Sequence, residues 1–498
     1  MSMRRLLHGI LFLAVFAMAF RVSIFPDSWW HLRAGQYIVE EKELLTWDPF
    51  SYTRFGEPWR YPGGIVQAAM YLVYDALGPG GMSLWTAVIV SLSFWFIHQS
   101  MPKTRVFSNA VLVLLASVAS AVFWTARPFL ITFLLTSVFM WILDGYRKKQ
   151  RDHVWWMPLL MLLWANSHGG FIVGFFLWGA YFLDMSIAWV RSNQIGEEVA
   201  PIKSIPRRWL GDLIKGAHGK LGLIGMLMLI VVPINPAGPI IYLYFFATFN
   251  VDAAWDLIAE WQSPNFHEPA ILPFLILVLI SLLLFGASRR RTPISHLIIT
   301  ALFLYMALLS GRNIALFALV MPVILAPHCD QMIRYLKREW ALPAAMFSDR
   351  TPTGIRRIVN YLIFILALVG SGAKVATVFP SQTQQALFRQ LYPVDAVSFI
   401  VNRGLEGRMM NSYSWGGYLQ MHLPQYPVYI DGRADLYGNE LIEEWLDFVS
   451  GAGNWQAILD KWEVNFIVVE SHWPVISLLE NAGWEQIYVD EIAVVYQR

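Results

Sequence analysis

The sequence is poor in cysteine and in charged residues, and each shortage excludes a class of protein. Cys329 is the only cysteine among 498 residues, and charged residues make up 14%. A single cysteine excludes a disulfide scaffold and a metal cluster built on several cysteine ligands. Soluble globular proteins carry about 25% charged residues, so an ordinary soluble enzyme is not expected. The net charge is +2, which is far from the strongly basic balance of nucleic-acid-binding proteins. Nucleic acid is therefore not expected as a partner.

Motifs of several large enzyme classes are missing as well. The sequence has no phosphate-binding P-loop, no dinucleotide-binding glycine pattern, no HExxH zinc pair and no nucleophile-elbow serine. Apolar residues are abundant instead: 56% of the chain is hydrophobic and 15% is aromatic. This composition predicts a polytopic α-helical membrane protein.

Apolar runs long enough to cross a bilayer occur about eleven times. A transmembrane helix needs about 20 mostly apolar residues. The candidate spans are 6–24, 83–100, 108–125, 128–143, 155–167, 171–190, 221–235, 270–286, 294–310, 313–327 and 358–379. A further apolar stretch, 65–77, is too short to cross comfortably and ends at the turn-forming segment 78–81.

The distribution of Lys and Arg indicates on which side the stretch 65–77 lies, because positive charges prefer cytoplasmic loops. If it does not cross, the cytoplasmic segments hold 23 Lys and Arg and the outer segments before residue 380 hold eight. If it crosses, the basic clusters 147–149 and 289–291 move outside. We therefore expect a surface helix at 65–77 within a first outer loop, 25–82. The N-terminus is then cytoplasmic in the plasma (inner) membrane; a cleaved signal peptide at 1–24 is the alternative.

The tail of the chain has a different pattern from residue 380 onward. Short β-like runs alternate with helix-like stretches, which predicts a small α/β domain. The β-like runs are Val428–Ile430, Phe466–Val469, Ile487–Val489 and Ala493–Tyr496, and the helix-like stretches are Leu441–Val449, Trp455–Trp462 and Val475–Leu479. Two domains follow: a transmembrane domain, 1–379, and an extracytoplasmic domain, 380–498.

An acidic residue stands where the first span reaches the outer side. Asp27 precedes a predicted helix over 28–40, and His31 follows four residues later on the same side of that helix. A carboxylate at the boundary of water and lipid has a raised pKa and makes a better general base. A helix-capping role is the alternative for Asp27. Asp48, which precedes a proline, has the pattern of a turn former.

Other polar residues are expected on the same side. Arg127 and Arg312 lie at outer helix ends, where a positive charge is unusual and calls for an anionic partner. They could clamp a lipid phosphate, form internal salt bridges or snorkel to the surface. Asn166 and His168 lie beside two glycines that permit a broken turn lining a cavity; a buried, satisfied histidine is the alternative. Glu260 could pair with an arginine, contact a polar substrate or lie exposed.

This order of features resembles the C-type glycosyltransferase superfamily (GT-C). That superfamily includes protein mannosyltransferases, aminoarabinose transferases and the catalytic subunit of oligosaccharyltransferase. The resemblance rests on the first helix, the emergent acid, the surface helix, about eleven spans and the external tail. Segments that resemble a bacterial branch are 27–32, 47–51, 166–170, 235–236, 260–261, 312–313, 415–418 and 431–433.

The resemblance implies an inverting glycosyltransferase that uses a polyprenyl-phosphate or polyprenyl-diphosphate sugar at the outer membrane face. In that interpretation Asp27 activates the acceptor, assisted by His31. The residues implied in binding the donor phosphate are Arg127, Arg312, His168 and Asn166. Some relatives need a divalent cation, Mg or Mn, for which Asp48 is the one candidate ligand.

The resemblance also implies an acceptor site, and here the acceptor is open among glycan, lipid and protein. The residues expected to bind acceptor sugar are Glu260, Tyr413, Trp415, Asp431 and Arg433. The alternative is a turn at Asp431-Gly432 with Arg433 paired to Asp435. No Trp-Trp-Asp signature is present, which disfavours protein N-glycosylation.

Two further functions stay open from the sequence. A transporter or flippase of a lipid-linked glycan would carry ionisable residues near mid-membrane, often in paired repeats. The notable charges of this chain fall instead at the outer helix ends. A non-catalytic scaffold of envelope-glycan assembly is the other possibility.

Overall fold

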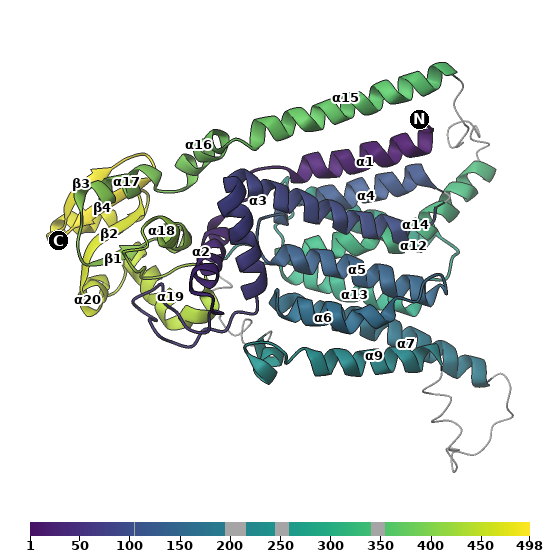
Figure 1. Ribbon diagram of the computed structural model, residues 1–498, viewed down its shortest axis with the longest axis horizontal. Helices are drawn as coiled ribbons and strands as arrows, with labels where there is room; N and C mark the ends of the chain where they lie inside the picture. The colour runs from purple at the N-terminus through teal and green to yellow at the C-terminus, as the bar shows by residue number, and fades with distance from the viewer. Residues whose placement is uncertain (104, 195–215, 245–257, 340–353) are drawn as a thin grey trace, which may run out of the picture.

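The computed structural model describes residues 1–103, 105–194, 216–244, 258–339 and 354–498. A helical bundle forms one end of the molecule and a mixed domain forms the other, with α2 and the start of α3 between them (Figure 1). A helix lies at each expected span. The bundle helices are α1 Met3–Ala19, α3 Gly64–Ser100, α4 Val106–Ser120, α5 Phe129–Arg147, α6 Met157–Ala165, α7 Ile172–Gln194, α9 Ala217–Val231, α12 Leu272–Ala287, α13 Ile294–Leu309, α14 Ile314–Glu339 and α15 Gly354–Val378.

Six helical stretches within the described ranges are long and apolar enough to cross a membrane. They are Gly64–Ser100, Val106–Phe123, Phe129–Arg147, Gly169–Ser192, Gly311–Leu336 and Arg357–Val378. Four apolar helices are shorter, and α1 has 17 residues. The chain is therefore a multi-pass membrane protein, while the number of eleven spans stays a prediction.

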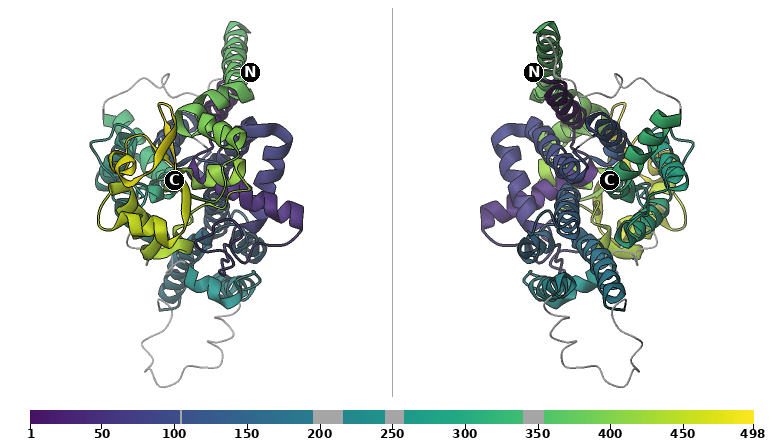
Figure 2. Two further views of the ribbon diagram at one scale, coloured as in Figure 1. Left: turned by 90° about the vertical axis from the view of Figure 1, so that its left-hand side faces the viewer. Right: turned by 90° about the vertical axis from the view of Figure 1, so that its right-hand side faces the viewer.

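The helix α15 is the most exposed of these candidate spans. It packs on α1 and projects from the rest of the bundle when the molecule is viewed end-on (Figure 2). None of its most apolar 18-residue window is buried, whereas 72% of the corresponding window of α14 is buried. An apolar surface of this size is stable in contact with lipid chains rather than with water.

The helix α2, Pro26–Glu41, and the first part of α3 pack directly against each other. A Cβ atom at Gly35 of α2 would overlap the backbone carbonyl of Gln67 in α3, so the close contact requires glycine. The helix α3 breaks at Gly78, whose φ of 64° favours glycine, and Pro79 follows. The expected end of the 65–77 helix is thus confirmed, and its place on the membrane surface stays a prediction.

The tail contains the small sheet and helices that the sequence predicted as an α/β domain. The sheet order is β1-β2-β4-β3, with β1 parallel to β2 and the other pairs antiparallel. The strands are β1 Arg408–Asn411, β2 Val464–Glu470, β3 Glu485–Val489 and β4 Ala493–Gln497. The helices are α16 Ser381–Leu391, α17 Val394–Arg403, α18 Gly416–His422, α19 Ala434–Ser450, α20 Trp455–Lys461 and α21 Ile476–Leu479.

One expected strand is wrong. The run Val428–Ile430 makes only an isolated bridge, between Val428 and Ser51 of the first outer loop. Its backbone groups have partners other than a neighbouring strand backbone. Val428 exchanges hydrogen bonds with the loop, and the side-chain Oδ1 of Asn411 in β1 accepts from the Tyr429 N–H at 2.7 Å. The parallel partner of β2 is instead β1, whose four residues are too few to give a clear alternating pattern.

The tail closes onto α2 through Gly417 of α18. The helix α18 packs on α2, and a Cβ atom at Gly417 would lie 2.8 Å from the backbone nitrogen of Trp30. The glycine therefore lets the backbones of tail and first outer loop approach closely. This contact brings the tail over Asp27, near the start of α2.

Candidate functional site

A cavity of about 690 Å³ is lined by residues of both the helical bundle and the tail. Seven of the residues expected from the sequence line it: Asp27, His31, Arg127, His168, Glu260, Arg312 and Tyr413. Apart from Asp27 and His31, these residues are far apart in the sequence, so the tertiary fold brings them together. Asp27 and the two arginines, which the sequence placed on one side of the membrane, thus line one cavity together with Glu260.

Arg127 holds two carboxylates at once. Its Nη1 lies 2.9 Å from Asp27 Oδ2, and its two terminal nitrogens lie 2.9 Å from the two Glu260 oxygens. The Nε of Arg127 donates to Thr125 Oγ1 at 2.7 Å. All three guanidinium nitrogens are therefore engaged, which orients Arg127 and links the first outer loop to the segment around Glu260.

Asp27 is the acid at the centre of this arrangement. Trp30 Nε1 donates to Asp27 Oδ1 at 3.3 Å, one helical turn away in α2. Burial raises the pKa of Asp27 above its ordinary value, and the charge of Arg127 partly opposes that rise. A Cβ atom at Gly432 would lie 2.5 Å from Asp27 Oδ1. The glycine of the Asp-Gly-Arg segment is thus what lets the tail backbone reach the acid.

Glu260 is held by Arg127 and by the start of α14. Although burial acts to raise its pKa, the ion pair with Arg127 lowers the pKa of Glu260 overall. The backbone carbonyl of Glu260 accepts from the Arg312 N–H at 3.0 Å, in the short 3-10 helix η5, Gly311–Asn313. Of the roles left open for Glu260, pairing with an arginine is the observed one.

Arg312 differs from Arg127 in having its charge available. Its guanidinium carbon lies 4.6 Å from the centre of the Trp261 ring, a cation–π distance. Within the described part of the chain, no carboxylate lies within 4.0 Å of its guanidinium nitrogens. Arg312 therefore lines the cavity as a cation that stacks on an aromatic ring and forms no ion pair within the described part of the chain.

The two histidines of the cavity are neutral. Burial, followed by the charge of Arg127, lowers the pKa of His31 well below its ordinary value. His31 Nδ1 lies 3.1 Å from Gln67 Nε2, and Trp30 rather than His31 contacts Asp27. Burial and the two arginines lower the pKa of His168 to about 3. Because its Nδ1 accepts from the Gly170 N–H at 3.0 Å, the proton lies on Nε2.

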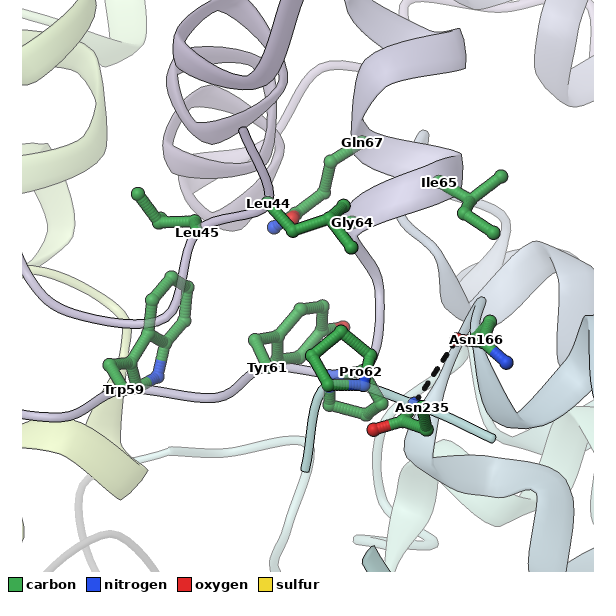
Figure 3. Close-up of a pocket in the computed structure, with 11 residues that line it drawn as sticks. Leu44, Leu45, Trp59, Tyr61, Pro62, Gly64, Ile65, Gln67, Asn166 and Asn235 are labelled. Carbon is green, nitrogen blue, oxygen red and sulfur yellow. Dashed lines mark hydrogen bonds between the residues drawn. The ribbon is translucent and has the colours of Figure 1, made fainter. Parts of the chain in front are cut away.

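Asn166 lies outside this cavity. It lines a separate small pocket of about 20 Å³ together with Asn235 (Figure 3). Asn166 Nδ2 donates to the carbonyls of Leu162 and Ile234, and Asn235 Nδ2 donates to the carbonyl of Ala165. These hydrogen bonds connect the end of α6 to the segment after α9. In this structure Asn166 therefore stabilises the fold and does not contact the cavity.

Asp431 and Arg433 form a buried ion cluster rather than a wall of the cavity. Arg433 is 1% exposed and lies 2.6 Å from both Asp48 Oδ1 and Asp431 Oδ2. Tyr437 donates to Asp431 at 2.7 Å. Arg433 thus pairs with Asp48 and Asp431, and not with Asp435 as the alternative interpretation had it. Trp415 is not among the residues that line the cavity, and its Nε1 donates to the Leu391 carbonyl.

Replacing Arg433 with Gln is expected to lower the free energy of unfolding by about 3–5 kcal/mol, because two buried carboxylates lose their cation. Thermal unfolding and limited proteolysis of the purified protein measure this loss. Arg403→Gln, which changes an exposed arginine of α17, should leave both readouts unchanged. Equal stability of the two variants would contradict the structural role of Arg433.

Comparison with solved structures finds an extended likeness. The archaeal oligosaccharyltransferase AglB from Archaeoglobus fulgidus, solved with an inhibitory peptide and a dolichol-phosphate, matches with a TM-score of 0.52 and 11% identity over 94% of this chain and 69% of that one. The apo form of the Archaeoglobus fulgidus oligosaccharyltransferase gives 0.51 and 12% over 93% and 69%. This chain has the GT-C fold. No protein-family model and no curated protein matches the sequence.

The GT-C fold raises the question of a divalent cation, and three described carboxylates that could hold one, Asp27, Asp48 and Glu260, are paired with arginines instead. Asp48 is fully buried and accepts from Arg433 and from the backbone N–H groups of Phe50 and Ser51. Asp27 and Glu260 share the guanidinium of Arg127, which takes the position between them. Among the described residues no group of three or more metal-binding side chains is found. Asp48 is therefore not supported as a ligand.

Several residues that line the cavity were not identified from the sequence. The tail supplies Ser412, Ser414, Asp435, Trp445 and Trp473. Burial raises the pKa of Asp435, which also accepts from Trp59 Nε1 at 3.3 Å. Because the chain contains 23 tryptophans, residue type alone does not indicate which of them line a binding site. Only their common position at one cavity distinguishes these residues.

Proposed function

We propose that the chain is an inverting glycosyltransferase that transfers a sugar from a polyprenyl-phosphate-linked donor to an acceptor at the outer face of the plasma membrane. The observation that carries the proposal is the meeting of Asp27, Arg127, Glu260 and Arg312 at one cavity between bundle and tail. An acid that can take a proton and a cation free to bind phosphate are the two groups such a transfer needs.

In the proposed reaction Asp27 takes the proton from the acceptor hydroxyl. The acceptor oxygen then bonds to the anomeric carbon of the donor sugar from the face opposite the phosphate. The bond between that carbon and the phosphate oxygen breaks, and the lipid phosphate leaves with the electron pair. Arg312 neutralises the negative charge on the leaving phosphate, because a guanidinium binds phosphate oxygens through two hydrogen bonds.

Arg127 and the neutral histidines have supporting roles in this proposal. Arg127 positions Asp27 and Glu260, since all three of its nitrogens are engaged. His168, with its proton on Nε2, can donate a hydrogen bond to the donor, and His31 helps to form the wall behind Asp27. The apolar lining residues of the bundle suit the lipid chain; they are Val122, Phe123, Phe129, Met306 and Leu316.

The proposal is tested by turnover of a radiolabelled polyprenyl-phosphate sugar by the purified full-length protein in lipid nanodiscs. Envelope extract from the source cells supplies the acceptor. Transfer of label from the lipid to a water-soluble or polymeric product is the expected result. Label that moves across a vesicle membrane without leaving the lipid would indicate a flippase, and no change of the donor would indicate a scaffold.

A further inference from the structure

The cavity has two chemically different walls. The wall formed by the bundle holds the two arginines and the apolar residues described above. The wall formed by the tail consists of Ser412, Tyr413, Ser414, Gly432, Ala434, Asp435, Trp445 and Trp473. None of these tail residues is Lys, Arg or His. Asp27 lies where the walls meet, since Gly432 packs against its carboxylate.

The tail wall is rich in hydrogen-bond acceptors. Glu470, behind the wall, accepts from the hydroxyls of Ser412 and Ser414 at 2.6 and 2.7 Å and from Trp473 Nε1 at 2.7 Å. With their protons turned toward Glu470, the two serine oxygens have only lone pairs left to offer. Asp435 adds a carboxylate that lines the cavity.

Tyr413 supplies the one hydroxyl of this wall that is not already used. Its buried Oη has no hydrogen-bond partner among the described residues. Burial, with the nearby charges of Asp27, Asp431 and Asp435, raises the pKa of the Tyr413 phenol well above its ordinary value, so the hydroxyl keeps its proton. A buried hydroxyl without a partner is unfavourable, and a ligand that bonds it removes that cost.

Two tryptophans complete the wall: Trp473 is partly exposed, and Trp445, which is 2% exposed, packs against it. Trp445 and Trp473 meet edge to face, with ring centres 5.6 Å apart at 83°. Indole rings bury large, rigid apolar surface with little loss of side-chain entropy. A sugar ring has an apolar C–H face and a rim of hydroxyl donors, and it matches this combination of indole surface and acceptor oxygens.

We propose that the tail wall is the acceptor subsite and that the acceptor is an uncharged, hydroxyl-rich glycan. This inference rests on the proposed function and narrows its acceptor class. An anionic acceptor, such as a phosphorylated lipid or an acidic polymer, would place its charge beside Asp27 and Asp435 with no cation on that wall. The glycan hydroxyl nearest to Asp27 is the nucleophile, because Asp27 lies at the meeting of the two walls.

The acceptor class is tested with lipid-linked sugars from source cells grown on a radiolabelled hexose and with unlabelled envelope extract from the same source. We expect the transferred label in material that resists protease and is not retained by an anion exchanger. Label in retained or protease-sensitive material would overturn the uncharged-glycan inference and leave the glycosyltransferase proposal standing. Absence of any transfer by the wild-type protein would overturn both.

The subsite is tested with Tyr413→Phe and Asp435→Asn, which keep the side-chain shape. Each should raise KM for the acceptor by about tenfold, which corresponds to about 1.4 kcal/mol for one hydrogen bond lost to the ligand. KM for the donor should stay within about twofold. The matched control is Tyr488→Phe in β3, a phenol of the same domain that does not line the cavity.

The split between the two KM values distinguishes this role from a structural one. A variant that only loosens the fold would impair donor and acceptor binding together and would lower the unfolding temperature. Unchanged acceptor KM in both variants, or equal changes in donor and acceptor KM, would overturn the assignment of the tail wall.

Discussion

Asp27→Asn is expected to lower kcat by a factor of about 10²–10⁴, the usual contribution of a general base. The amide keeps the size of the carboxylate and can still accept from Trp30 Nε1, so the fold should persist. It cannot take a proton from the acceptor hydroxyl. The rate is measured as release of labelled sugar from a polyprenyl-phosphate donor at saturating donor and acceptor.

The pH dependence gives this prediction a second readout. Asp27 acts as a base only when it has lost its proton, so the rate falls as the pH drops below its pKa. Because burial raises that pKa, the fall begins at a higher pH than it would for an exposed aspartate. The acidic limb of the kcat/KM profile should therefore disappear in Asp27→Asn.

Asp75→Asn is the matched control for this variant. Asp75 is an exposed residue of α3 that does not line the cavity, so its replacement should leave kcat and the acidic limb unchanged. If Asp27→Asn turned over at the wild-type rate, Asp27 would not be the base, whereas the GT-C fold would be unaffected.

Arg312→Ala is expected to lower kcat/KM for the donor by about 10²–10³-fold. Truncating one partner of a buried charge pair costs about 2–5 kcal/mol, and Arg312 is the cavity cation without a carboxylate partner in the described part of the chain. Arg312→Lys should give an intermediate loss. Lysine keeps the charge but has neither the two-pronged geometry for phosphate nor the flat group that stacks on Trp261.

The control for Arg312 lies near the far end of α14, the helix that follows η5. Arg334 is 55% exposed and pairs with Asp330, so Arg334→Ala should leave donor kcat/KM unchanged. A loss in Arg127→Ala without a loss in Arg312→Ala would contradict our assignment of the phosphate-binding cation. That result would favour Arg127 as the phosphate-binding cation, with the phosphate replacing Asp27 and Glu260 as its partner.

The sequence predicted much of the helical architecture because the necessary signals are local. A run of about 20 apolar residues is visible without knowledge of its neighbours, and each expected span coincides with a described helix. The break before Pro79 was visible for the same reason. The sequence did not reveal the strand β1 or the place of Val428–Ile430 outside the sheet. Both depend on β pairing with partners that are distant in the chain.

The candidate site was predicted in part. Residues unusual for their membrane position, such as Asp27, Arg127 and Arg312, do line the cavity, because an isolated charge near a membrane must find a polar environment. Asn166, Trp415, Asp431 and Arg433 were expected at the site, but they lie in structural contacts outside it. Polar residues that tie the fold together look the same in a sequence as polar residues that bind a ligand.

The sequence by itself determined that this protein is built of apolar helices with unusual charges at helix ends, because hydrophobic length and charge are properties of single segments. Only the tertiary structure decided how those charges pair. Arg127 pairs with both Asp27 and Glu260, whereas Arg312 stacks on Trp261 and has no ion pair within the described residues. Arg433 pairs with Asp48, which is 385 positions away in the sequence. Electrostatic energy depends on distances in space, and those distances are set by the packing of the tail onto α2.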